Sequence, residues 1–247
     1  MFLTPLKNLL LPLAPRPIRI LRGPFRGAVI HMSLRNNVRK VLGVYEHEFN
    51  PWLEAVLPLV DTVLDVGAND GYFTFGCAAA FRRLGKQAEI FAFEPLEDHC
   101  EELESSKRLQ PSDSGVTITV MHALVGAVVA PGMTTLDALA ASLSRERPVE
   151  GRRTLVKIDV EGAEVEVLGG ASKWLQPENY FLVEIHSEAN LSTLRTRFAE
   201  AGLIIEEHEE RALPMLGKEH RAKQNWWLVS PLPQERRGLA NDGSRSK

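Results

Sequence analysis

The segment at residues 63–74 constrains the fold of this chain more than any other. An apolar run of β-forming residues contains Asp65, and a loop with Gly67 and Gly71 follows at once, before the small-residue segment Phe73–Phe81. Strand, tight turn and helix in this order bring backbone N–H groups against a nucleotide-like ligand at the carboxyl end of a parallel strand. The two glycines would leave room for the ligand and permit unusual φ values. Their G-x-x-x-G spacing differs from the dinucleotide pattern G-x-G-x-x-G.

A second apolar run that ends in an acid lies one βα unit further on, at Glu89–Glu94. Glu94 stands where an acid that reaches the ribose hydroxyls of a nucleotide belongs. Pro95 stops the strand and suits the first turn of a helix. The alternative is an ordinary βα turn followed by a solvated carboxylate.

Strands and helices alternate along most of the chain, which demands a parallel sheet covered on both faces. The last two predicted strands lack a crossover helix, so we expect the final strand to run antiparallel. The predicted fold is therefore α/β, with a mostly parallel seven-stranded sheet and helices on both faces. We expect strands at Thr62–Val66, Glu89–Glu94, Val116–His122, Thr154–Asp159, Tyr180–His186, Leu203–Glu207 and Trp226–Val229, and helices at Glu46–Leu57, Tyr72–Arg83, Glu97–Arg108, Leu136–Leu143 and Leu191–Ala201.

The 247 residues suffice for one well-buried domain. We expect an N-terminal arm at residues 1–43, a domain at 44–230 and a disordered tail at 231–247. A net charge of −3 argues against a nucleic-acid partner. Two cysteines without zinc spacing, and no apolar run of membrane-span length, suit a cytoplasmic protein. The sequence does not determine the oligomeric state.

The N-terminal arm leaves a weak contact with a membrane surface open. Its basic residues stand among Leu and Ile, a mixture that suits the interface between lipid headgroups and acyl chains. An arm that packs on the domain is the ordinary alternative. The basic residues are Lys7, Arg16, Arg19, Arg22 and Arg26.

Three motifs resemble those of the FkbM-type S-adenosylmethionine-dependent methyltransferases. They are DVGANDGYFT at Asp65–Thr74, FAFEP at Phe91–Pro95 and KIDVEGAE at Lys157–Glu164, of which the last is the most specific. Thr135–Asp137 and Val183–His186 are weaker matches. The resemblance implies a Rossmann-like methyltransferase fold and S-adenosyl-L-methionine as cofactor. It also implies methyl transfer to a hydroxyl oxygen of a sugar, glycolipid or polyketide-like acceptor.

Four of the predicted strands end in polar or ionisable residues, at the sheet edge where ligands of such folds bind. The glycine loop would hold the amino-acid part of the cofactor, Glu94 the ribose, and the backbone after the third strand the adenine. The predicted cofactor-binding residues are Asp65, Gly67, Ala68, Asn69, Gly71, Tyr72, Glu94, Pro95, His122, Ala123 and Asp159.

Methyl transfer from a sulfonium to a hydroxyl needs in-line positioning and removal of the hydroxyl proton. Asp159, Glu161 and His186 are the predicted catalytic residues, since they follow the fourth and fifth strands. His186 has the side chain whose unperturbed pKa is near neutrality. A structural, hydrogen-bonded histidine is the alternative for this position.

Several neighbours of this group have more than one interpretation. Asp159, Glu184 and His186 could bind a divalent cation, but they lack a ligand spacing, and we assign no metal. Glu164 suits the N-terminal turn of a helix, where an acid interacts with the helix dipole. Lys157 lies within an apolar strand, either at the edge of the site or with a snorkelling side chain.

Two other functions stay open. A nicotinamide-dependent oxidoreductase would require a third glycine, and Tyr72 follows Gly71 instead. A non-catalytic scaffold that binds the cofactor is the other alternative, although the carboxylates at the strand ends speak against it.

Overall fold

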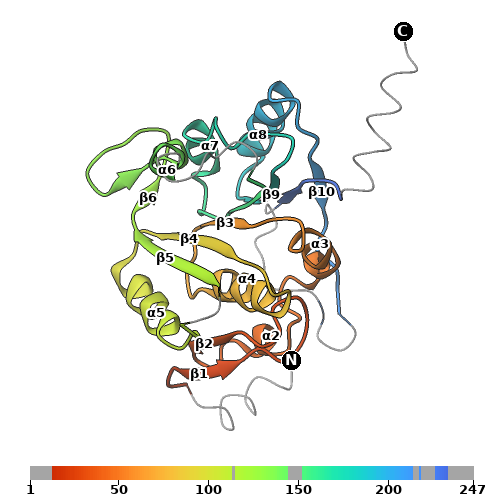
Figure 1. Cartoon of the computed structure of the whole chain (residues 1–247). Coiled ribbons are helices and arrows are strands. Elements are labelled where there is room, and N and C mark those ends of the chain that lie inside the picture. Colours follow the sequence, from red (N-terminus) through yellow and green to blue (C-terminus); the bar gives the residue numbers. More distant parts are fainter. Residues whose placement is uncertain (1–12, 113–114, 144–151, 214–216, 218–225, 233–247) are drawn as a thin grey trace.

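One large sheet forms the middle layer of the molecule (Figure 1). The computed structural model describes residues 13–112, 115–143, 152–213, 217 and 226–232, and within them seven strands form this sheet in the order β10-β11-β9-β8-β3-β4-β5. Neighbouring strands from β9 to β5 are parallel, whereas β11 pairs antiparallel with both β9 and β10. The predicted mostly parallel sheet with an antiparallel last strand is confirmed. The strands are β3 (Thr62–Val66), β4 (Ala88–Glu94), β5 (Val116–His122), β8 (Thr154–Ile158), β9 (Tyr180–Ile185), β10 (Glu206–His208) and β11 (Trp226–Val229).

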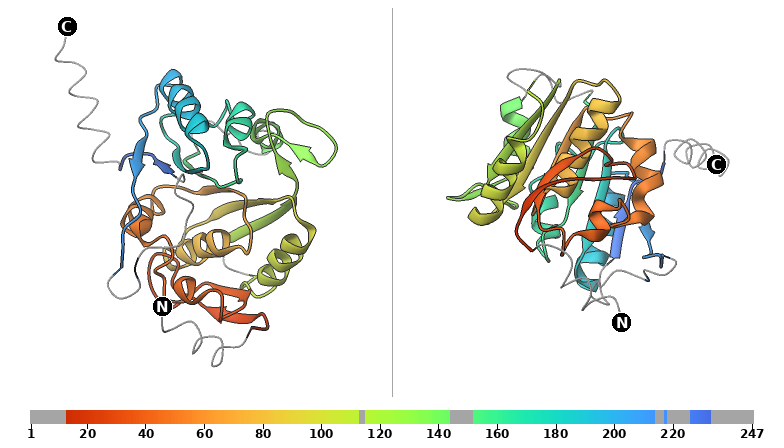
Figure 2. Two further views of the ribbon diagram at one scale, coloured as in Figure 1. Left: turned by 180° about the vertical axis from the view of Figure 1, so that it is seen from behind. Right: turned by 90° about the horizontal axis from the view of Figure 1, so that it is seen from below.

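Helices cover both faces of the sheet, as Figures 1 and 2 show. Side chains of successive strand residues point to opposite faces. Val63 of β3 and Ile90 of β4 therefore pack in a core with α3 and α4, while Leu64 and Phe91 pack in a second core with α6, α7 and α8. The helices are α3 (Asn50–Val56), α4 (Tyr72–Arg83), α5 (Glu97–Lys107), α6 (Leu136–Leu143), α7 (Glu164–Gly169) and α8 (Glu188–Glu200).

A short parallel pair of strands lies beyond the carboxyl end of β5. It consists of β6 (Leu124–Val125) and β7 (Met133–Thr134). Backbone hydrogen bonds join the two segments, from Leu124 N to Gly132 O at 3.0 Å and from Gly126 N to Thr134 O at 2.9 Å. This pair extends the structure above the sheet edge where the candidate site lies.

The described part of the N-terminal arm folds onto the domain. The antiparallel pair β1 (Arg16–Arg19) and β2 (Val29–Met32) and the short helix α2 (Val38–Val41) lie outside α4 and α5, on the side away from the sheet (Figure 1). Ile20, Phe25 and other apolar side chains of this segment are buried in the first core. Residues 13–43 of the arm are therefore packed on the domain.

The predicted helix at Glu46–Leu57 is wrong in its first part. Glu46 has a left-handed backbone with φ 47°, and a 3₁₀ turn at His47–Phe49 comes before α3. Pro51 stands in the first turn of α3, where proline is tolerated because its missing N–H would have no helical partner.

Two other elements begin more than one residue away from the predicted position. α8 begins three residues earlier than predicted because Ser187 caps it, with its hydroxyl accepting a hydrogen bond from Asn190 N at 3.2 Å. β10 begins later than predicted, at Glu206. Nearly all of the predicted C-terminal tail, residues 233–247, lies outside the described residues. Among the described residues, no helix is long and apolar enough to cross a membrane.

Candidate active site

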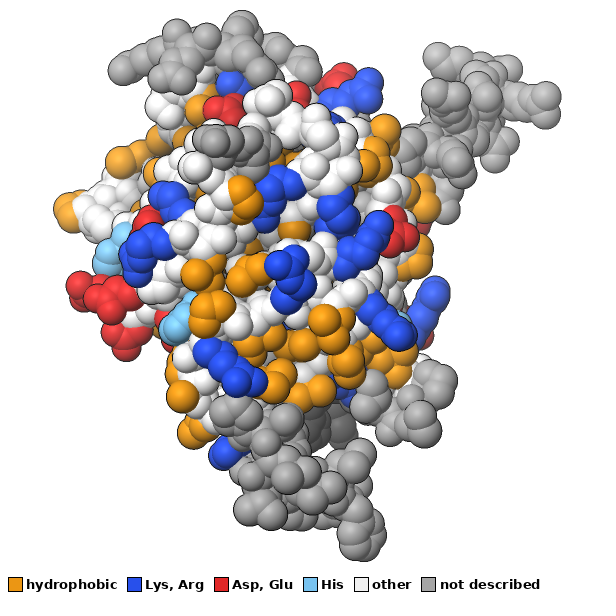
Figure 3. Space-filling view, turned by 60° about the horizontal axis from the view of Figure 1, so that its bottom comes forward, with side chains coloured by type: hydrophobic (Ala, Val, Ile, Leu, Met, Phe, Trp, Pro, Cys, Tyr) orange, Lys and Arg blue, Asp and Glu red, His pale blue; other side chains and the backbone are white. Residues whose placement is uncertain are grey.

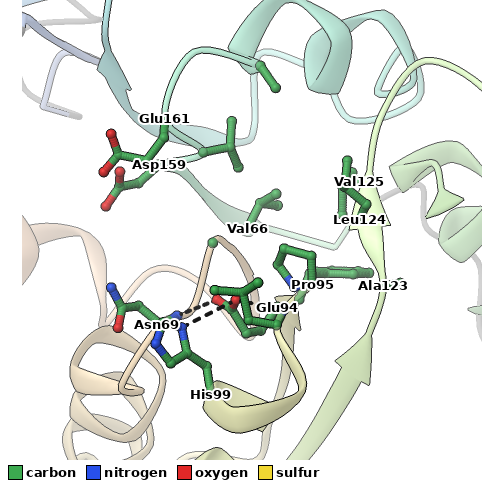
Figure 4. A pocket seen from close by; sticks show the side chains of 15 residues that line it. Val66, Asn69, Glu94, Pro95, His99, Ala123, Leu124, Val125, Asp159 and Glu161 are labelled. Carbon is green, nitrogen blue, oxygen red and sulfur yellow. Dashed lines mark hydrogen bonds and ion pairs between the residues drawn. The ribbon is translucent and has the colours of Figure 1, made fainter. Parts of the chain in front are cut away.

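A pocket of about 380 Å³ lies at the carboxyl ends of β3, β4, β5 and β8 (Figure 4). Its volume is typical of sites for small molecules. Asp159 and Glu161 lie on one side of it, and Glu94 and His99 lie on another. The pocket is lined by Val66, Gly67, Asn69, Phe93, Glu94, Pro95, Leu96, His99, Ala123, Leu124, Val125, Asp159, Val160, Glu161 and Ala163.

The carboxylate of Glu94 ties the glycine loop to the start of α5. It accepts hydrogen bonds from Asn69 N at 2.9 Å and from Leu96 N at 3.1 Å. One ring nitrogen of His99 lies 3.5 Å from Glu94 Oε1. Figure 4 shows the Glu94 carboxylate facing Asn69 and His99 at the base of the pocket. Glu94 therefore organises the loop and also lines the pocket.

The glycines of the loop are required by neighbouring protein atoms. A Cβ on Gly67 would lie 1.8 Å from the backbone oxygen of Asp159, and φ at Gly67 is 80°. A Cβ on Gly71 would lie 2.5 Å from the Phe75 ring, again at φ 80°. The structure thus gives a reason for both glycines that the sequence did not: close packing of the loop on β8 and α4.

A buried ion pair lies beneath the loop. Asp65 is fully buried, accepts a hydrogen bond from Thr74 Oγ1 at 2.5 Å, and has Oδ1 3.4 Å from Lys157 Nζ. Lys157 also donates to Gly67 O at 2.9 Å and lies 3.3 Å from Asp159 Oδ2. Burial opposes the ammonium charge, but the two aspartates outweigh it and raise the pKa of Lys157.

This ion pair changes the interpretation of two sequence positions. Asp65 does not line the pocket, so the structure does not bring its side chain to the place where a direct ligand of the cofactor would lie. Lys157 does not snorkel, because it is buried, and its ammonium lies beneath the pocket against the lining residues Gly67 and Asp159.

The other predicted cofactor residues divide into two groups. Asn69, Gly67, Glu94, Pro95, Ala123 and Asp159 line the pocket, whereas Ala68, Gly71, Tyr72 and His122 do not. Tyr72 packs instead against the ring of Phe25, with a centroid distance of 5.2 Å. His122 Nε2 lies 3.0 Å from Pro95 O, so its ring braces the segment after β4.

His186 and Glu164 form a hydrogen-bonded pair beside the pocket. His186 Nδ1 donates to Glu164 Oε1 at 2.7 Å, and Glu164 is fully buried. Asn190 Nδ2 donates to Glu164 Oε2 at 2.6 Å, and Gly162 N donates to Oε1 at 2.7 Å. The hydrogen bond to Glu164 raises the pKa of His186. Burial works against the Glu164 carboxylate, but these hydrogen bonds outweigh it and lower the pKa of Glu164.

The three predicted catalytic residues come together. His186 Nε2 lies 3.4 Å from Glu161 Oε2 and 4.0 Å from Asp159 Oδ1. Glu161 has a left-handed backbone with φ 52°, and its side chain is 88% exposed. Such strained residues occur often at functional sites. Because Glu164 holds one ring nitrogen of His186, the other nitrogen faces the two carboxylates.

Asp159, Glu184 and His186 also approach one another, with one ligand atom of each within 4.8 Å of the others. Oxygen and imidazole ligands of this kind could hold a divalent cation. The ammonium of Lys157 already supplies a positive charge 3.3 Å from Asp159. The geometry therefore needs no metal to balance Asp159, and we assign none.

Several lining residues were missed in the sequence. Leu96 is the residue just before α5, and His99 stands in the first turn of that helix. Val125 and Val160 are apolar residues of the pocket wall. The sequence could have indicated Leu96 and His99, because the segment that follows the strand-end acid Glu94 must lie at the same edge of the sheet.

Comparison with known proteins finds a family match that includes one of the three sequence motifs, Lys157–Glu164. Residues 107–211 match the family model described as "Methyltransferase FkbM domain". Hexuronic acid methyltransferase AglP from Haloferax volcanii is 29% identical over 161 residues, which cover 59% of this chain and 64% of that protein.

Among solved structures, methyltransferase FkbM from Methylobacillus flagellatus aligns with a TM-score of 0.52 and 17% sequence identity, over 70% of this chain and 44% of that chain. This chain thus spans less than two thirds of the length of either protein. The resemblance to the FkbM-type methyltransferases is confirmed over residues 107–211, which include the motif at Lys157–Glu164, and the chain has a Rossmann-like fold.

Proposed function

We propose that this protein is an S-adenosylmethionine-dependent methyltransferase that methylates a hydroxyl group. The proposal rests on a single pocket. Glu94, which accepts a hydrogen bond from the glycine loop, lies at the base of this pocket, and the hydrogen-bonded pair His186–Glu164 lies beside the wall that contains Asp159 and Glu161. The name of the relative from Haloferax volcanii supports a sugar as the acceptor class. A glycolipid or a polyketide-like molecule is the other acceptor class that the family resemblance implies.

The residues around the pocket fit such a cofactor. Glu94 has each carboxylate oxygen engaged once by a backbone N–H, which leaves acceptor capacity for ribose hydroxyls. Ala123, Leu124 and Val125 provide an apolar wall for a purine. When bound, S-adenosylmethionine supplies a methyl group on a positively charged sulfur, and Asp159 would lie on the same side of the pocket as the acceptor.

We assign to His186 the removal of the proton from the acceptor hydroxyl. Glu164 fixes its ring by a hydrogen bond to Nδ1, so that Nε2 is the nitrogen available to a hydroxyl. Positioning of the acceptor by Asp159 and Glu161 would account for much of the remaining rate. In this assignment Glu164 and Asn190 are positioning residues, because they act through His186.

Titration calorimetry with S-adenosylmethionine, S-adenosylhomocysteine and NAD tests the cofactor. We expect the two sulfur compounds to bind and to raise the unfolding temperature, because a ligand that binds only the folded state stabilises it by mass action. Binding of NAD alone would overturn the proposal in favour of an oxidoreductase. Cofactor binding without turnover on any hydroxyl acceptor would favour the non-catalytic scaffold.

Glu94→Gln refines this test, because it removes the charge and keeps one acceptor oxygen for the loop. We expect S-adenosylhomocysteine affinity to fall by about 1–3 kcal/mol, the cost of losing charge-assisted hydrogen bonds. Glu97→Gln is the matched control, since Glu97 lies three residues further on, is exposed and does not line the pocket. Equal affinity in the two variants would place the ribose elsewhere.

A further inference from the structure

Charge is distributed very unevenly along this chain. Residues 1–43 contain no Asp or Glu, although the whole chain has 32 acidic residues and a net charge of −3. The segment carries Lys7, Arg16, Arg19, Arg22, Arg26, Arg35, Arg39 and Lys40. A basic segment on an otherwise acidic protein indicates an anionic partner for that segment.

The structure presents part of this charge on a fixed surface. Arg16, Arg19 and Arg22 are exposed in or directly after β1. Ile18 and Ile20 flank Arg19 and are buried in the first core, so this segment cannot turn Arg19 inward. Burial of the two isoleucines therefore fixes this segment on the domain with the three arginines exposed.

Apolar side chains stand among these cations. Leu21 is 58% exposed and Leu13 is 54% exposed, and Leu42 of the same segment is also exposed. We call the exposed residues Leu13, Arg16, Arg19, Leu21, Arg22 and Leu42 the hairpin surface. Figure 3 shows the face that carries it: Lys and Arg side chains lie beside an apolar area, and acidic side chains lie toward the edge.

We propose that the hairpin surface docks on an anionic lipid membrane. Arginines pair with lipid phosphates, and exposed leucines enter the boundary between headgroups and acyl chains. A nucleic acid would use the arginines but would leave the leucines in water, so the mixture favours lipid. The acidic remainder of the chain is repelled by the same membrane, which orients the molecule with the hairpin surface toward the lipid.

Cosedimentation of the full chain with lipid vesicles tests this docking. We expect binding to vesicles of phosphatidylcholine with phosphatidylglycerol, little binding to phosphatidylcholine alone, and loss of binding at high salt because the attraction is electrostatic. Each basic residue near such a surface strengthens binding about fivefold, so Arg19→Glu with Arg22→Glu should weaken it at least about twentyfold. Leu21→Ser should weaken it without any change of charge.

The matched control is Arg153→Glu with Lys173→Glu, which makes the same change of charge at exposed positions outside the hairpin. Unfolding temperatures of all variants verify that each is folded. The proposal is overturned if the protein does not bind the anionic vesicles, if both double variants lose binding equally, or if a DNA or RNA oligonucleotide binds and the vesicles do not. Vesicle binding needs no turnover, so its outcome is separate from that of methyl transfer.

Discussion

At the scale of single residues, the orientation and the pKa of the His186 ring depend on its hydrogen bond to Glu164. Glu164 is buried, negatively charged and 2.7 Å from Nδ1, and it raises the pKa of the imidazole. A base must be neutral to accept a proton, so its activity should increase as the pH rises through this raised pKa. A histidine that only stabilises the fold would give the same hydrogen bond but no such rate dependence.

The first prediction is a pH–rate profile with an ascending limb above pH ~6.5, the ordinary histidine value. Glu164→Gln should move the limb to lower pH, since the partner that favours the protonated ring loses its charge. His186→Gln should abolish the limb and lower turnover about a hundredfold or more, while cofactor affinity stays close to that of the wild type. Wild-type turnover in His186→Gln would return this residue to a structural role.

The second prediction concerns the buried pair Lys157–Asp65. Lys157→Met removes the cation and leaves the Asp65 carboxylate buried without it, which should cost about 3–5 kcal/mol of unfolding free energy. Adding Asp65→Asn should recover part of the loss, because the uncompensated charge is then gone. Denaturant unfolding measures both variants, and an unchanged midpoint for Lys157→Met would show that the pair contributes nothing.

At the scale of elements, the loop between β3 and α4 is shaped by the strand beside it. Gly67 N and Ala68 N both donate to Phe93 O at 3.0 Å, and Gly67 packs on the backbone after β8. The loop is therefore held from β4 and from β8. Lys40 of α2 also reaches it, with Nζ 2.5 Å from Asp70 Oδ2.

The third prediction separates backbone strain from close packing at this loop. Gly67→Ala and Gly85→Ala both place a side chain at positive φ, which costs about 1–2 kcal/mol. A Cβ on Gly85 meets nothing within 4 Å, whereas one on Gly67 meets Asp159 O at 1.8 Å. Gly67→Ala should therefore lose about 1–3 kcal/mol more in thermal unfolding, the usual cost of overpacking. Equal losses would mean that the loop can move away from β8.

At the scale of the whole molecule, the N-terminal segment forms an additional layer outside α4 and α5 (Figure 1). Phe25 packs edge-on against Tyr72 and Phe73, with ring centroids 5.2 and 5.5 Å away. A Cβ on Gly76 of α4 would lie 2.3 Å from the Phe25 ring. The segment is thus built into the core on the side of the sheet that carries the glycine loop.

The fourth prediction is that Phe25→Ala destabilises the protein by about 3–5 kcal/mol, as expected for loss of a buried aromatic ring. Leu21→Ala in the same segment should change stability by no more than about 0.5 kcal/mol, since Leu21 is largely exposed. Thermal or denaturant unfolding measures the difference. A small effect of Phe25→Ala would support an arm that only rests on the domain.

The sequence by itself determined the order and type of the main elements. Thr62–Val66, Tyr72–Arg83, Val116–His122 and Leu136–Leu143 were predicted with the bounds that the structure has. Each is specified locally, by an apolar run or a helical pattern with turn residues at its ends. Parallel strands bring their carboxyl ends to one edge, so the position of the site could also be predicted.

The tertiary structure alone decided which charged side chains meet there. Lys157 reaches Gly67 across 90 residues of sequence, and His186 reaches Glu164 across 22. A strand-end carboxylate has the same local pattern whether it is buried, as Asp65 is, or faces a pocket, as Glu94 does. Burial and pairing of such groups depend on the packing of neighbouring strands and loops, a long-range property that no local pattern contains.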